Sequence, residues 1–120
     1  MRLRSYFSTE KKMLRQIKST QRLPRLLAFK ITGTGTAAIN IGSFDATLTD
    51  NGTGDYTVTF SKPFARTPIA VATCQTATCY AEIAACSSTA VQVLTKSNAN
   101  SATDAVFYLF VQGYDAADET

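Results

Sequence analysis

The spacing of apolar residues changes within the first thirty positions of this 120-residue chain. Residues 9–19 place Met13, Leu14 and Ile17 on one side of a helical repeat. From Leu26 onwards apolar and polar residues alternate in short runs that Gly, Asn, Asp and Ser separate. The pattern predicts a short amphipathic helix over residues 9–19, followed by a body made of β-strands.

The body is predicted to contain short strands at residues 26–31, 36–41, 45–49, 55–61, 68–76, 78–86, 90–95 and 105–113. Tyr56, Val58 and Phe60 point to one side of their strand, as in an antiparallel sheet with one buried face. Asn and Gly within Asp50–Gly54 tolerate positive φ, so a hairpin is expected there. Because nothing after Lys30 resembles a crossover helix, the predicted fold class is all-β, an antiparallel β-sandwich or jelly roll.

The last predicted strand is apolar on both faces. It contains Phe107, Tyr108, Leu109 and Phe110 in succession. Such a run belongs either to the centre of a sandwich or to a strand whose second face packs on another subunit. We therefore expect these four residues to be buried in the core or at a subunit interface.

Two prolines interrupt the strand pattern between residues 61 and 69. Pro63 and Pro68 each lack a backbone donor and have a fixed φ, so the connection should be stiff and the sheet can change direction there. Phe64 lies between them and is expected to fill the core.

Charge divides the chain into two parts. Residues 1–30 carry nine of the twelve basic side chains and one acid, whereas residues 31–120 carry three bases and eight acids. A +8 segment therefore precedes a −5 segment. The predicted organisation is a basic N-terminal arm over residues 1–30 and a β-sandwich domain over residues 31–120.

Apolar residues recur among the cations of the arm, and such residues favour a packed partner. The arm is therefore predicted to dock on an acidic protein surface. The residues expected to make this contact are Arg2, Arg4, Tyr6, Phe7, Met13, Leu14, Arg15, Ile17, Arg22 and Arg25. One alternative is that the cations bind the phosphates of a nucleic acid, with a binding strength that falls as salt rises. The other is that the arm is merely solvated.

The residue composition does not indicate an enzyme. The chain has no histidine, so neither a Ser–His nor a Cys–His nucleophile pair can form within it. Cys74, Cys79 and Cys86 are one ligand short of a four-cysteine zinc site and are expected to be buried free thiols. Formation of one disulfide is the alternative if the protein leaves the cell. No catalytic residue, cofactor or metal is predicted.

Two local motifs receive ordinary structural interpretations. Gly33, Gly35 and Ala38 have the spacing of a dinucleotide-binding loop, but alternating residues follow them instead of a helix. Asp50 and Asp55 flank the predicted hairpin, where aspartate is common in turns, and their spacing with Asp45 differs from that of a calcium-binding loop.

Neither a signal peptide nor a membrane span is expected. Charged residues interrupt the first 27 positions every few residues, and no stretch approaches the roughly 20 apolar residues of a membrane-spanning helix. The protein is expected to be made in the cytoplasm.

Two segments of the body resemble bacteriophage virion β-domains. Residues 54–72 contain a Gly-x-Tyr-x-Val-x-Phe strand, a Pro-Phe-Ala corner and an apolar strand, and residues 107–115 read Phe-Tyr-Leu-Phe-Val-Gln-Gly-Tyr-Asp. Similar sequence patterns occur in head decoration proteins, tail-fibre tips and H-type lectin-like domains. The resemblance implies a homotrimer in the virion, in contact with other capsid or tail proteins.

The resemblance leaves the role of the chain open. The first interpretation is a decoration (cement) or fibre component that attaches through its arm. The second is a receptor- or glycan-binding fibre tip, with the loops around residues 50–54 and 96–104 as contact surface. A nucleic-acid-binding protein with a basic arm is the third.

Overall fold

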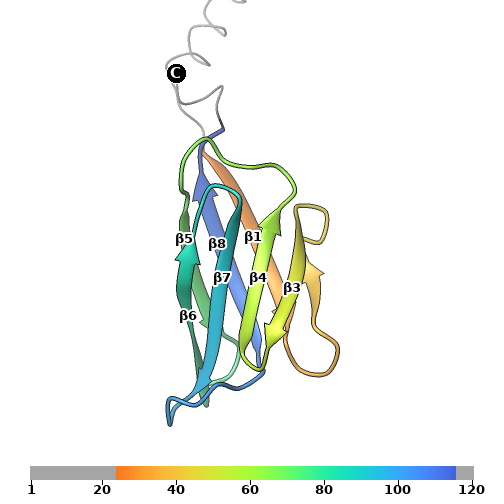
Figure 1. Cartoon of the computed structure of the whole chain (residues 1–120), viewed down its shortest axis with the longest axis vertical. Coiled ribbons are helices and arrows are strands. Elements are labelled where there is room, and N and C mark those ends of the chain that lie inside the picture. Colours follow the sequence, from red (N-terminus) through yellow and green to blue (C-terminus); the bar gives the residue numbers. More distant parts are fainter. Residues whose placement is uncertain (1–23, 116–120) are drawn as a thin grey trace, which may run out of the picture.

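The computed structural model describes residues 24–115, which form two antiparallel four-stranded sheets (Figure 1). The strands are β1 (Arg25–Thr32), β2 (Ala38–Ile41), β3 (Ala46–Gly52), β4 (Asp55–Phe60), β5 (Ile69–Cys74), β6 (Cys79–Cys86), β7 (Ala90–Ser97) and β8 (Val106–Gly113). One sheet has the order β2-β1-β8-β5 and the other β3-β4-β7-β6. The all-β prediction is confirmed, whereas the helix expected at residues 9–19 lies outside the described residues.

The two sheets enclose one apolar core. Alternate residues of the central strands point inward, and Tyr56 and Val58 on β4 are fully buried as the sequence predicts. The ring of Phe107 lies 5.4 Å from the ring of Tyr56, so a residue of one sheet packs directly on a residue of the other. The buried cluster consists of Leu27, Phe29, Ile31, Ala46, Tyr56, Val58, Phe60, Phe64, Val91, Val93, Phe107, Leu109 and Val111.

The first strand begins at Arg25, one residue before its predicted start, and runs across the charge boundary. Leu27, Phe29 and Ile31 are all buried and belong to one alternating run that continues across Lys30. The boundary expected between residues 30 and 31 therefore falls inside β1, because burial follows the alternation and not the charge. β1 pairs with β8 along its whole length, which brings the two ends of the described chain together (Figure 1).

The hairpin expected at Asp50–Gly54 is present between β3 and β4. Gly52 and Gly54 have φ values of +130° and +64°, a region that favours glycine. The backbone N–H of Gly52 donates to Oδ1 of Asp50 at 3.0 Å. The glycines therefore take the positive φ that the sequence predicted for this turn, whereas Asn51 does not.

The proline corner carries the chain from one sheet to the other. It connects β4 to β5, and Phe64 within it is buried, as predicted. The Phe64 ring meets the ring of Phe60 edge to face, with centroids 5.2 Å apart. The corner thus closes one end of the core.

Within residues 24–115 no helix is long and apolar enough to cross a membrane.

Candidate functional site

The outer face of the β2-β1-β8-β5 sheet is apolar, although it points away from the core. Five of its large side chains are exposed to between 49% for Phe110 and 71% for Ile69. We define the apolar face as Leu26 and Ala28 on β1, Ile41 on β2, Ile69 and Val71 on β5, and Tyr108 and Phe110 on β8. Contiguous exposed apolar patches of this kind mark interaction sites in soluble proteins.

Strand register makes the apolar face continuous. Phe110 lies at its centre, paired with Ala28 on one side and with Val71 on the other. The next row places Leu26 and Ile69 on either side of Gln112. Directly paired residues have Cβ atoms about 5 Å apart, so the side chains of a row touch across the sheet.

The outer face of the other sheet has the opposite character. On β4 the outward residues include Thr57 and Thr59, and across β6 and β7 the Lys96 ammonium lies 2.8 Å from a Glu82 carboxylate oxygen. Gln92 donates to Asp55 at 2.9 Å on the same face. Antiparallel sheets commonly have one buried and one solvated face. The polar sheet follows this rule, and the apolar one departs from it.

A shallow apolar hollow opens in the apolar face above β1. It has a volume of about 140 Å³ and is lined by Ala28, Phe29, Lys30, Ile41, Tyr108 and Phe110. Ala28 is short, while its neighbours across the sheet are large, so the surface dips at this position. The opposite edge of the face carries Ile69 and Val71, which are 71% and 58% exposed. We call the side of the face on β1 and β2 the hollow half, and the side on β5, which carries the most exposed large side chain of the face, Ile69, the protruding half.

Arg25, predicted as part of the docking arm, instead has partners within the folded body. Its guanidinium lies over the Phe64 ring, 4.0 Å from the centroid, and Nη2 donates to the carbonyl of Lys62 at 2.8 Å. Nε is 3.1 Å from Oδ1 of Asp115, a close ion pair without good hydrogen-bond alignment. These contacts hold the start of β1 against the corner.

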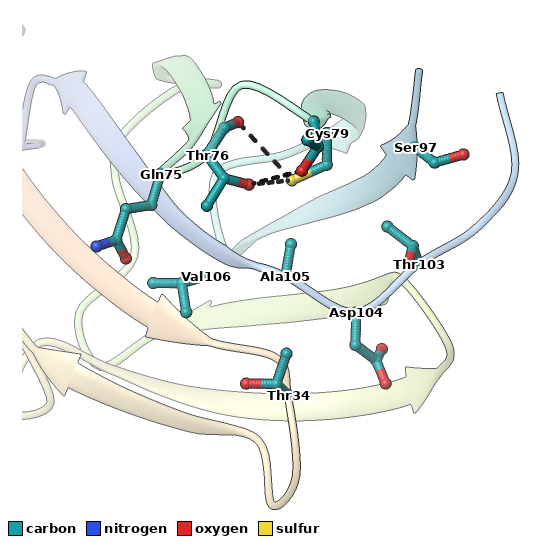
Figure 2. Close-up of a pocket in the computed structure, with 10 residues that line it drawn as sticks. Thr34, Gln75, Thr76, Cys79, Ser97, Thr103, Asp104, Ala105 and Val106 are labelled. Carbon is teal, nitrogen blue, oxygen red and sulfur yellow. Dashed lines mark hydrogen bonds between the residues drawn. The ribbon is translucent and has the colours of Figure 1, made fainter. Parts of the chain in front are cut away.

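A polar hollow of about 480 Å³ lies at the other end of the strands, near the connection from β7 to β8. Figure 2 shows Thr76 beside the Cys79 thiol, 3.1 Å from it, with Asp104 and Thr34 on the other side of the hollow. Ser97 and Thr103 add hydroxyl groups to the lining. The expected contact loop at residues 96–104 supplies part of this wall.

Asp104 is held in place by residues of the hairpin. Its Oδ1 accepts hydrogen bonds from the Tyr56 hydroxyl at 2.6 Å and from the backbone N–H of Gly54 at 2.8 Å. These two bonds lower the pKa of Asp104, the one from Tyr56 most. Burial, followed by the hydrogen bond to Asp104, raises the pKa of Tyr56. At neutral pH the pair is therefore a carboxylate and a neutral phenol.

The three cysteines are free thiols, half-buried instead of fully buried as expected. Burial raises the pKa of the Cys74 thiol to about 12, with further contributions from the hydrogen bond and charge of Cys79. Burial also raises the pKa of Cys86. Cys74 and Cys86 pack against the core, so they act as small apolar residues, in line with the sequence interpretation.

The two local motifs have structural roles. Gly33 is close-packed, because a Cβ there would lie 2.1 Å from the Tyr56 hydroxyl oxygen. Asp50 caps its own turn, and Asp55 accepts from Gln92 and from Asn51. Within residues 24–115 no group of three or more metal-binding side chains is present.

The side chains of the predicted interface strand point alternately to the two faces of its sheet. Phe107 and Leu109 are fully buried in the core, whereas Phe110 and Tyr108 belong to the apolar face. The predicted arm residues, apart from Arg25, lie outside the described residues. Sequence reasoning missed that Ile41, Ile69 and Val71 join Phe110 on one surface. The available indication was residues 69–72, Ile-Ala-Val-Ala, which lack a polar side on either face.

No family model, curated protein or solved structure matches this chain. Its function therefore has to be argued from its own surfaces.

Proposed function

We propose that this protein is a non-enzymatic structural component of a bacteriophage particle, and that it acts by binding other proteins. In this proposal the body is a β-sandwich, the class of two-sheet folds that includes the jelly rolls. It forms a homotrimer and serves as a capsid decoration (cement) protein or as a fibre component. The residue patterns at 54–72 and 107–115, which resemble virion β-domains, support the assignment to a phage particle.

The apolar face is the observation that carries the proposal. Five large apolar side chains, about half exposed or more, lie on one sheet: Leu26, Ile41, Ile69, Val71 and Phe110. Leaving them in water costs about 25 cal/mol for each Å² of apolar surface. A protein partner that covers the face recovers this free energy, whereas a small polar ligand does not.

The basic arm supplies the second contact of the proposal. Its cations would pair with acidic groups on a capsid or tail protein, and this charge complementarity favours fast and correctly oriented association. Tyr6, Phe7, Met13, Leu14 and Ile17 would supply the apolar anchors. The nucleic-acid alternative rests on the same cations, and Arg25 among them already has partners within the folded body.

A fibre tip that binds a receptor glycan is the second candidate, because of the polar hollow. Hydroxyl groups and the Asp104 carboxylate line it, and sugars bind through hydrogen bonds to such groups. Screening of the full chain for binding on a glycan array tests this candidate. Binding that Asp104→Asn abolishes would move the function from assembly to recognition.

Mass spectrometry of gradient-purified phage particles tests the proposed function. We expect peptides of this chain in the particles, in a fixed ratio to the major capsid or tail protein. A protein that is abundant in infected cells but absent from purified particles would contradict a structural role in the virion.

A further inference from the structure

We propose that the apolar face binds a second copy of this chain, with the protruding half of one copy seated in the hollow half of the next, so that three copies close into a ring. The inference rests on the proposed structural function and names the surface through which the subunits meet. It requires no part of residues 1–23.

The apolar face supplies the apolar centre of the subunit contacts. Each of its five large, half-exposed side chains presents roughly 100 Å² of apolar surface, which gives on the order of 500 Å² in total. A stable interface buries about 800 Å² on each partner, with a polar rim around its apolar centre. In the ring each copy buries both halves of the face, so this apolar surface is divided between two contacts, and flanking residues such as Thr73 and Gln112 belong to the polar rim of each contact.

The hollow on one half of the face and the exposed Ile69 side chain on the other are the two features that this contact brings together. The hollow half dips at Ala28 between Ile41 and the two aromatic residues of β8, with room for about one large apolar side chain. The protruding half offers Ile69, the most exposed apolar residue of the face. Because both halves lie on the same chain, a second copy supplies the matching surface without any other partner.

The distribution of charge fits a head-to-tail contact. Among the outward-facing residues of this sheet, Lys30 is the charged one, and it lines the hollow half. A head-to-tail contact places this cation opposite the uncharged β5 half of the neighbour, so two Lys30 side chains need not meet. Head-to-tail contacts generate a ring when the rotation closes and a filament when it does not. A closed ring of any size uses every face, and the number three is taken from the proposed homotrimer.

Two variants of the full chain separate the halves. Ala28→Trp fills the hollow and leaves the protrusion intact, whereas Ile69→Asp removes the protrusion and leaves the hollow intact. Thr59→Asp, on the outer face of the polar sheet, is the matched control for the added charge. Native mass spectrometry gives the number of chains, and circular dichroism melting checks that each variant is folded.

We expect three chains for the wild type and for Thr59→Asp, and one chain for each of the other two variants alone. An equimolar mixture of Ala28→Trp and Ile69→Asp should give a heterodimer, because one intact protrusion and one intact hollow can still pair. A wild-type monomer, including one whose own residues 1–23 cover the face, would overturn the inference. So would a trimer that both folded variants retain, or a wild-type dimer.

The result is separate from the test of the proposed function. A chain that is present in phage particles but monomeric by itself keeps its structural role and loses this interface. A trimer that depends on Ala28 and Ile69 but is absent from particles keeps the interface and loses the virion role.

Discussion

Tyr56 connects the core to the loop end of the molecule. Its ring is fully buried against Phe107, while its hydroxyl donates to Asp104 and lies 3.3 Å from the carbonyl oxygen of Gly33. One side chain thereby ties β4 to the segments that precede β8 and follow β1. The inward direction of Tyr56 was predictable from alternation. Its partner was not, because Asp104 is 48 residues away in the sequence.

Removal of the Tyr56 hydroxyl should destabilise the fold without changing its shape. Tyr56→Phe keeps the ring and leaves Asp104 with one donor fewer, so we expect a loss of about 1–2 kcal/mol in the free energy of unfolding. Urea denaturation monitored by circular dichroism measures it. An unchanged free energy of unfolding would show that water replaces the bond at no cost.

The same variant should change the response to acid. The pKa of Asp104 is lowered in the folded state, so its contribution to stability is present above the unfolded aspartate pKa, near 3.9, and is lost as pH falls through the lower, folded value. Without the Tyr56 donor the folded pKa rises towards the unfolded one. We therefore expect Tyr56→Phe to lose less stability than the wild type between pH 5 and pH 2, and equal losses would contradict this assignment.

At the scale of the element, the β3–β4 hairpin depends on Gly54 for space as well as for backbone conformation. A Cβ at this position would lie 2.4 Å from the Thr95 carbonyl oxygen and 2.9 Å from the Thr103 nitrogen. Gly35 has a similar φ of +69°, but a Cβ there would meet nothing within 4 Å. The two glycines therefore form a matched pair.

Alanine at the two positions should separate steric conflict from backbone strain. We expect Gly35→Ala to cost about 1–2 kcal/mol, from the left-handed conformation alone. Gly54→Ala should cost about 3 kcal/mol or more, because backbone atoms must also move. Melting temperatures of the two variants provide the comparison. Equal losses of stability would mean that residues 95–103 can move away from the added Cβ at no cost in free energy.

The strands were largely predictable and their arrangement was not. Every predicted strand overlaps an observed one, because alternation and turn residues act locally. Boundaries differ where tertiary pairing extends a strand, as in β3, which continues to Gly52 along β4. The order β2-β1-β8-β5 joins strands distant in the sequence, and no local pattern encodes that pairing.

At the scale of the whole molecule, the two outer faces differ in a way that the proposed assembly would explain. One is rich in threonine and charged residues, and the other presents Leu26, Ile41, Ile69, Val71 and Phe110. The sequence predicted that the last strand would be buried on both faces. In a single chain Phe110 remains 49% exposed, so the second face needs a partner for that expectation to hold.

The most direct test is the light-scattering mass of the full-length protein and of Phe110→Glu, over a range of concentrations. Thr59→Glu serves as the control, and a thermal melt of each variant verifies folding. We expect a mass three times that of the 12.9 kDa chain for the wild type and the control. We expect the mass of one chain for Phe110→Glu, because burying an unpaired charge at the centre of the apolar face is strongly unfavourable. The same mass for all three folded proteins would contradict the claim that this face holds subunits together.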